Sequence, residues 1–291
     1  MSYPLTRRSF LSQSALAASA VCLGTRAAFA APPNMRLGLV TYMWAAKWDL
    51  PTLIANCQKT RVLGVELRTT HAHGVEPSLS AAERRDVKKR FDDSEVTCVG
   101  PGSNERFDNP DAAKVRQAIE TTKAFVKLSH DIGGTGVKVK PDRFWPNVPR
   151  DKTIEQIGKS LNELGAFAAD YGQEIRLEVH GQCAELPTIK AIMDIADHKS
   201  VAVCWNSNAQ DLQGKGLEHN FNLVKDRFGE TCHVRPLDDP SYPYQKLLDL
   251  LVKAKYAGWV MIESGPVPDD VVKALAAQRA LFDRMVKAAA G

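Results

Sequence analysis

The chain has 291 residues and a formal net charge of +4, from 38 basic and 34 acidic residues. Its first thirty residues contain three arginines and no acidic residue, so the remaining 261 residues carry a net charge of only +1. A nearly neutral chain lacks the basic surface that binds phosphates or anionic lipids, and we therefore expect no nucleic-acid partner and no stable membrane anchor.

Residues 1–30 predict a cleavable export signal. An arginine pair, Arg7-Arg8, precedes an alanine-rich apolar stretch that is too short to span a bilayer as a helix. Small residues then stand at positions 28 and 30, where a signal peptidase reads the chain. The arginine pair resembles a twin-arginine (Tat) signal, with an ordinary Sec signal as the alternative. We therefore expect the Tat export machinery as a partner and a periplasmic mature protein.

From residue 31 onward, short β-branched runs alternate with longer runs of helical periodicity. The expected strands are 36–43, 62–68, 95–99, 136–140, 174–180, 200–206, 231–235 and 258–263. The expected helices are 50–59, 80–91, 111–131, 152–171, 186–197, 217–228, 242–256 and 269–288. Strands that alternate with helices form a parallel sheet, and this length is typical of a closed barrel. We therefore predict one domain, residues 31–291, with the α/β fold of a single eight-stranded (β/α)₈ TIM barrel.

Polar side chains alternate with apolar ones along several predicted strands, although a parallel barrel strand is normally apolar throughout. Period two places each polar series on one face, which is the interior when helices cover the outside. Charges in a dry interior cost several kcal/mol unless they are paired or bind a ligand. The pattern therefore predicts one polar site at the C-terminal mouth of the barrel. Its members are Glu66, Arg68, Lys138, Lys140, Arg176, Glu178, His180, His233, Arg235 and Glu263.

A short H-x-H sequence, His71 and His73, follows the second predicted strand. In an extended segment both imidazoles lie on one side, an arrangement that can hold a metal ion or contact a substrate. The motif is unspecific, and an exposed loop explains it equally well.

Taken together, the strand sequences resemble those of the xylose isomerase-like barrels, a group of sugar phosphate isomerases and epimerases and family 2 AP endonucleases. The resemblance covers most of residues 35–288. It is carried by GVEL at 64–67, RLEVHG at 176–181, VCWN at 203–206, HVR at 233–235 and GWVMIE at 258–263.

The resemblance implies a divalent metal ion held by residues from four successive strands. Epimerases of this group use Glu, Asp, His and Glu, which correspond here to Glu178, Asn206, His233 and Glu263. Asn206 departs from the pattern, because an amide oxygen can bind a hard cation but supplies no charge. We therefore expect weaker binding of Mn²⁺, Mg²⁺, Co²⁺ or Zn²⁺, or recruitment of another ligand such as Asp211.

The implied function is a metal-assisted sugar isomerase or epimerase that enolises a keto sugar or glycoside, with a keto-sugar lyase as a chemically adjacent activity. Glu178 and Glu263 would be the catalytic residues that take and return the proton. The substrate-binding residues would be Glu66, His71, His73, Lys138, Lys140, Arg176, His180 and Arg235.

Two other functions compete with this one. A non-catalytic carbohydrate-binding barrel that has lost a metal ligand would account for Asn206. An AP endonuclease is disfavoured because the chain has only seven histidines for the His-rich zinc site of that branch. In each sugar-binding reading the partner is a small-molecule carbohydrate, and the sequence is compatible with a homo-oligomer.

Overall fold

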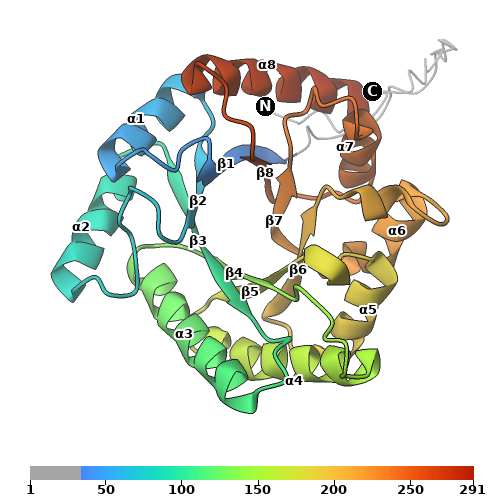
Figure 1. Cartoon of the computed structure of the whole chain (residues 1–291). Coiled ribbons are helices and arrows are strands. Elements are labelled where there is room, and N and C mark those ends of the chain that lie inside the picture. The colour runs from blue at the N-terminus through green and yellow to red at the C-terminus, as the bar shows by residue number, and fades with distance from the viewer. Residues whose placement is uncertain (1–33) are drawn as a thin grey trace, which may run out of the picture. The chain divides into compact units, whose positions relative to one another are not determined.

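The computed structural model describes residues 34–291. Its eight parallel strands form a closed barrel in the order β1 to β8, and β8 pairs with β1 to complete the ring. Figure 1 looks along the barrel and shows the helices outside the strands. The predicted (β/α)₈ TIM barrel is therefore confirmed. The predicted signal segment, residues 1–30, lies outside the described residues.

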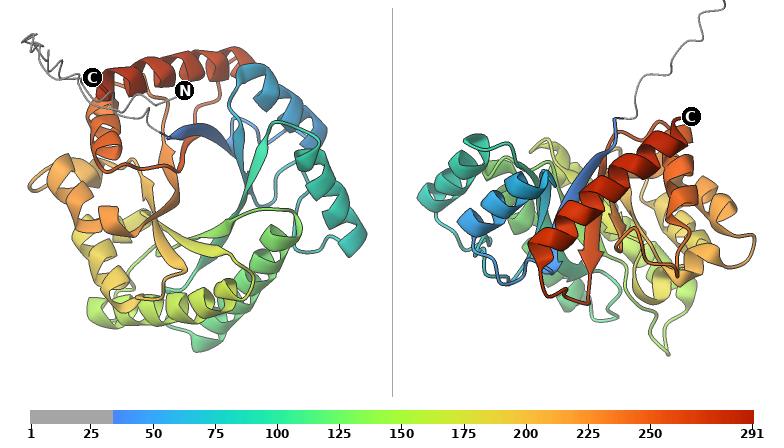
Figure 2. Two further views of the ribbon diagram at one scale, coloured as in Figure 1. Left: turned by 180° about the vertical axis from the view of Figure 1, so that it is seen from behind. Right: turned by 90° about the horizontal axis from the view of Figure 1, so that it is seen from above.

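Strands and helices alternate along the whole described chain, and Figure 2 shows the helices around the strands from two further directions. The strands are β1 Arg36–Met43, β2 Gly64–Arg68, β3 Thr97–Arg106, β4 Gly136–Lys140, β5 Glu174–Glu178, β6 Val201–Asn206, β7 Phe228–Val234 and β8 Trp259–Ser264. The α-helices are α1 Leu50–Thr60, α2 Ala81–Asp92, α3 Ala112–Asp131, α4 Arg150–Ala169, α5 Leu186–Ile195, α6 Leu217–Val224, α7 Tyr244–Lys253 and α8 Val271–Ala289.

Several helices begin where a side chain accepts a hydrogen bond from the first turn. Asp49, Asp111 and Asp270 cap α1, α3 and α8, and Ser80 forms a reciprocal capping box with Glu83 at the start of α2. These contacts satisfy backbone donors that have no partner within the helix. No helix within residues 34–291 is long and apolar enough to cross a membrane.

Strand β3 is longer than predicted. The expected strand covers 95–99, whereas the observed strand runs from Thr97 to Arg106 and so extends seven residues further. Gly100 and Gly102 made this segment resemble a turn. In the barrel, a Cβ on Gly102 would lie 2.6 Å from Oε1 of Glu66. Gly100 has a φ of +135°, and the β2–β3 register shifts beside it. Gly102 therefore makes room in the barrel interior for side chains of β2, whereas Gly100 lets the backbone of β4 approach at Gly136.

Two apolar layers hold the barrel together. The larger one lies between the strands and the helices, whereas a small interior cluster consists of Val40, Val99, Trp259 and Met261. Both layers leave the C-terminal ends of the strands free for polar side chains. The fold therefore places the polar residues of β5 to β8 together at one end of the barrel.

Candidate active site

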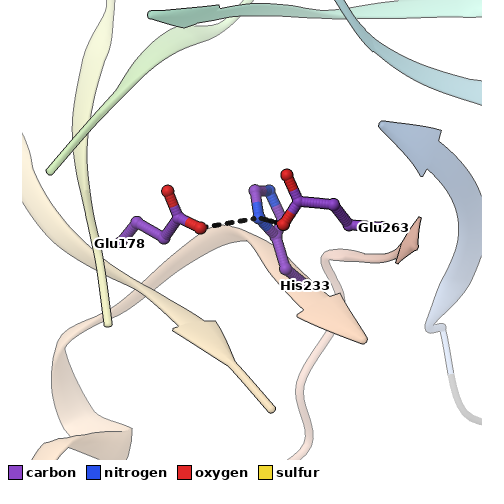
Figure 3. Close-up of side chains that lie close together, drawn as sticks. All are labelled: Glu178, His233 and Glu263. Carbon is purple, nitrogen blue, oxygen red and sulfur yellow. Dashed lines mark ion pairs between the residues drawn. The ribbon is translucent and has the colours of Figure 1, made fainter. Parts of the chain in front are cut away.

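Four neighbouring strands each place one polar side chain at the C-terminal mouth. Glu178 ends β5 and Asn206 ends β6, whereas His233 and Glu263 are the penultimate residues of β7 and β8. Strand register places Asn206 beside His233. One ligand atom from each of Glu178, His233 and Glu263 lies within 4.8 Å of the others. In Figure 3 the two carboxylates approach the imidazole of His233 from either side.

His233 is fully buried, and its two ring nitrogens have different surroundings. Nε2 lies 3.0 Å from Oε2 of Glu66, and because a carboxylate accepts, Nε2 carries the proton and donates it. Nδ1 is buried without a hydrogen-bond partner in residues 34–291, at 3.3 Å from Oε2 of Glu263 and 3.6 Å from Oε1 of Glu178. In the neutral ring, the lone pair of Nδ1 therefore faces both carboxylates.

Glu178 is held as a carboxylate by cations and donors around it. Burial alone would raise its pKa, but the Lys138 ammonium, 2.8 Å from Oε2, and His233 together hold the pKa of Glu178 well below its ordinary value. Its other oxygen, Oε1, accepts a hydrogen bond of 3.0 Å from Nδ2 of Asn206. Glu178 is therefore ionised and fixed in position.

Asn206 contacts the cluster through its amide nitrogen. The same contact would be repulsive for an aspartate, because two carboxylates would then face each other. Half a turn of the amide would bring Oδ1 to the place of Nδ2 and offer an oxygen ligand. Asp211, the other candidate ligand, is engaged elsewhere: its Oδ2 accepts from the Asn208 backbone at 2.9 Å and from the Tyr242 hydroxyl at 2.7 Å.

The cluster fits a divalent cation in both donors and charge. Burial lowers the pKa of His233, but neighbouring negative groups, Glu66 and Glu263 among them, raise it well above its ordinary value. A cation at Nδ1 would therefore take the place of a proton. With the ring neutral, the carboxylates of Glu66, Glu178 and Glu263 and the ammonium of Lys138 would leave two negative charges for that cation. Two carboxylate oxygens and an imidazole nitrogen are suitable ligands for Mn²⁺, Co²⁺ or Zn²⁺, and three protein ligands leave positions open for a substrate. The unpartnered Nδ1 of His233 is the atom that such an ion would satisfy.

A cavity of about 830 Å³ opens above this cluster. The loop from β8 to α8 borders the cavity, and Nε1 of Trp44 donates to the carbonyl of Pro266 in this loop at 2.6 Å. The predicted residues His180, Lys140 and Arg235 contribute to its wall. The polar lining includes Arg68, Lys140, Glu178, His180, Asn206, Asn208, Arg235, Asp239 and Glu263.

Other residues predicted to bind substrate lie outside the cavity wall. Glu66 and Lys138 are buried beneath it, where they contact His233 and Glu178. Arg176 lies toward the N-terminal end of the barrel, where it pairs with Glu174 at 2.8 Å and Glu230 at 3.3 Å. These three side chains therefore contact other protein groups instead of lining the cavity.

The H-x-H pair also lies apart from the cluster. His73 is buried; its Nδ1 accepts from the Val75 backbone at 3.0 Å, and its Nε2 therefore donates to the Arg68 carbonyl at 2.8 Å. His71 Nδ1 contacts the Thr41 hydroxyl at 3.1 Å. Both nitrogens of His73 are thus used to shape the loop after β2, and the ligand group found in residues 34–291 does not include either histidine.

Arg68 was predicted as a member of the polar mouth, from the polar series of β2, but not as a substrate-binding residue. Arg68 is 9% exposed and lines the cavity beside Tyr42. Its signal was its place two residues after Glu66, which puts both side chains on the inner face of the strand.

Comparison with known proteins agrees with this architecture. The sequence pattern of a family described as "xylose isomerase-like TIM barrel" matches residues 54–281. The chain belongs to the xylose isomerase-like TIM barrel family. No curated protein matches the sequence.

Solved structures of this fold include several sugar epimerases. The 3-keto-D-glucoside 4-epimerase YcjR from E. coli is 14% identical, with a TM-score of 0.73, and the match covers 86% of this chain and 99% of that one. The D-psicose 3-epimerase from Clostridium cellulolyticum is 17% identical, with a TM-score of 0.71 and coverage of 87% and 99%. The IolI protein, with a bound zinc atom, is 16% identical, with a TM-score of 0.73 and coverage of 87% and 99%. At these identities the likeness concerns the fold.

Proposed function

We propose that this member of the family is a divalent-metal-dependent sugar isomerase or epimerase that acts by enolising a keto sugar or keto-glycoside. The observation that carries the proposal is the cluster itself. Two carboxylates lie on either side of a buried imidazole nitrogen that has no hydrogen-bond partner in the described chain, at the floor of a polar cavity. The epimerases and the zinc-containing protein among the structural neighbours support the same reading.

When bound, a divalent ion supplies polarisation of the substrate carbonyl and stabilisation of the enediolate charge. The protein supplies the proton transfer. Glu178 and Glu263 reach the cluster from β5 and β8, so one can remove the proton beside the carbonyl and the other can return it to the opposite face. Lys138 keeps Glu178 ionised and thus able to act as the base. Glu263, 16% exposed, adjoins the cavity.

The same proton removal next to a 3-keto group also permits loss of the C1 substituent as an alcohol. The base takes the proton from C2, the electron pair forms a C1–C2 double bond, and the leaving oxygen receives a proton. A keto-glycoside lyase is therefore a second candidate activity for the same residues. The size of the cavity favours it, because 830 Å³ lies in the upper part of the range of ligand pockets.

Proton exchange measured by NMR in D₂O tests the proposal. A panel of keto sugars and 3-keto-glycosides should lose one C–H signal in the presence of the metal-loaded protein, and a chelator should stop the exchange. Glu178→Gln and Glu263→Gln should each slow it by about 10²- to 10⁴-fold, because each removes one proton-transfer group. Glu185→Gln, an exposed residue at the start of α5, is the matched control and should exchange normally. Normal exchange in both site variants would refute the catalytic roles.

Asn206 motivates a different reading, a carbohydrate-binding barrel without catalysis. This reading is favoured if calorimetry detects sugar binding that a chelator leaves unchanged and no sugar carbon exchanges its proton. Restoring the missing charge with Asn206→Asp should in that case create metal binding that the natural chain lacks.

We also propose that residues 1–30 direct export to the periplasm by the Tat route. The support is the arginine pair, the short apolar stretch and the small residues at positions 28 and 30. Replacing Arg7 and Arg8 by lysine should keep the protein in the cytosol. Export that survives this change but stops when the Sec translocase is inhibited would assign the signal to the Sec route.

A further inference from the structure

Four cations extend from strands β2, β4 and β5 into the barrel, and only two of them have an ion-pair partner. Lys138 pairs with Glu178, and Arg176 pairs with Glu174 and Glu230. Neither Arg68 nor Lys140 has a carboxylate partner anywhere in residues 34–291. These two are the ones that line the cavity.

Arg68 is 9% exposed, its guanidinium carbon lies 5.8 Å from the centre of the Tyr42 ring, and of the guanidinium nitrogens only Nη1 donates hydrogen bonds to residues 34–291. Its Nη1 donates to Oδ1 of Asn104 at 2.8 Å and to the Gly102 carbonyl at 3.4 Å. Nε is buried, and neither Nε nor Nη2 has an acceptor within the described chain. Nε and Nη2 together form the planar fork that binds both oxygens of a carboxylate.

Lys140 ends β4 and reaches the same cavity, without a hydrogen bond or ion pair to residues 34–291. Burial, and the nearby charge of Lys138, lower the pKa of Lys140. A partly buried cation without a counter-ion is costly, and a bound anion removes the cost.

The cavity therefore has two electrostatic halves. Strands β5 and β8 contribute the carboxylates of Glu178 and Glu263, whereas β2 and β4 contribute the cations of Arg68 and Lys140. A neutral sugar would satisfy the first half and leave two cations without a counter-charge. A sugar with an anionic group at the end away from the reacting carbons would satisfy both.

We propose that Arg68 and Lys140 form a subsite for the carboxylate of an acidic sugar, so that the substrate is a keto sugar acid of the uronate type. The inference rests on the proposed function, whose site it extends. A phosphate ester is also anionic, but TIM barrels frequently bind phosphate through the loops after strands 7 and 8, whereas Arg68 and Lys140 belong to strands β2 and β4. One planar fork and one ammonium match a carboxylate better.

Calorimetry with matched sugars tests the subsite. D-fructose and D-fructuronate differ only at C6, where one has a hydroxymethyl group and the other a carboxylate, and D-tagatose and D-tagaturonate form a second pair. The protein, with and without Mn²⁺, should bind at least one acid about 10- to 100-fold more tightly than its neutral partner, as expected for hydrogen bonds to a charged group. Equal affinities within both pairs would overturn the proposal, and tighter binding of D-fructose 6-phosphate would overturn the choice of carboxylate.

Variants then locate the preference. Arg68→Gln and Lys140→Gln should each reduce the preference for the acid by about tenfold while leaving the neutral sugar's affinity unchanged. Lys140→Gln keeps the test decisive if the more buried Arg68 variant does not fold. Arg143→Gln, an exposed cation on the following loop that does not line the cavity, is the control and should bind like the natural protein. Variants that weaken the acidic and the neutral sugar equally would refute the subsite.

The two proposals can fail separately. Tight binding of an acid that depends on Arg68 and Lys140, without C–H exchange in D₂O, would refute enolisation and leave the subsite standing. C–H exchange that is equally fast on an acidic sugar and its neutral partner, and that neither variant changes on the acidic sugar, would support enolisation and refute the subsite.

Discussion

At the scale of single residues, the hydrogen bonds around His233 decide which of its nitrogens is available. Glu66 accepts from Nε2, so in the neutral ring the lone pair lies on Nδ1 and is directed at Glu178 and Glu263. Carboxylates that hold a metal-binding histidine in this way fix its tautomer and orientation. Glu66 is therefore a positioning residue: it contacts His233, the proposed metal ligand, and does not contact the substrate.

Replacing Glu66 tests this role through metal affinity. Glu66→Gln preserves the size of the side chain but removes the charge that orients His233, and we expect affinity for Mn²⁺ to fall by about 10- to 100-fold. Titration calorimetry measures the affinity, and Glu185→Gln serves again as the control. Unchanged affinity in a folded Glu66 variant would show that His233 needs no such support.

The raised pKa of Asp211 predicts that the free energy of unfolding depends on pH. Burial raises its pKa to about 7, although the Asn208 amide and the Tyr242 hydroxyl both donate to it. The unfolded chain releases this proton near pH 4, so between about pH 4 and pH 7 the folded state binds more protons than the unfolded one. The stabilisation of the folded state by protonated Asp211 is fully present below pH 4 and is lost as the pH rises through about 7.

Asp211→Asn should remove this dependence, because an amide cannot ionise. We expect the free energy of unfolding of the variant to be close to that of the natural protein at pH 4 and higher by about 1–3 kcal/mol at pH 8. Urea unfolding at the two pH values gives the comparison. An equal effect of the substitution at both would show that Asp211 does not titrate in this range.

At the scale of elements, strand β5 has the clearest period-two pattern, because Arg176 and Glu178 alternate with apolar residues that face the helices. Strand β6 has no such alternation, since residues 201–205 are apolar and buried, and only Asn206 at its end is polar. Strand β3 was harder to predict, because Gly100, Pro101 and Gly102 indicate a turn when only local preferences are considered. Gly102 is required by the side chains of β2 and Gly100 by the close backbone of β4, and local preferences along the sequence do not include either contact.

The same limit applies to the candidate site. Period two placed Arg176 and Glu178 on one face, and both do project into the barrel, but alternation does not tell how far along the axis each side chain acts. Arg176 lies two residues before Glu178 on β5, and therefore nearer to the N-terminal end of the barrel. There it pairs with Glu174 and Glu230 and does not reach the cavity. His73 was ambiguous for another reason, since its backbone contacts arise only when the loop after β2 closes.

At the scale of the whole molecule, the barrel interior contains two separate groups of charges. It also contains a small apolar cluster, which strands β1, β3 and β8 contribute. The group at the C-terminal mouth opens into the cavity and includes two cations, Arg68 and Lys140, that have no carboxylate partner in residues 34–291. The group at the N-terminal end is internally paired: Arg176 contacts Glu174 and Glu230, and Glu230 also contacts Arg36. Removing one partner of a buried ion pair leaves the other charge uncompensated and destabilises the fold, whereas a cation without a carboxylate partner is available to a ligand.

This division predicts opposite effects for two cations on neighbouring strands. Arg176→Met leaves Glu174 and Glu230 without their shared partner, and we expect unfolding to become easier by about 2–3 kcal/mol, below the full cost of a broken buried pair because both glutamates are partly exposed. Its affinity for Mn²⁺ and for sugars should be unchanged. Lys140→Gln should weaken the binding of the acidic sugar and have little effect on stability, because no protein group pairs with its charge within the described barrel. Thermal unfolding and calorimetry on both variants measure the four quantities, and a loss of sugar affinity in Arg176→Met that exceeds its loss of folded protein would contradict the separation of the two groups.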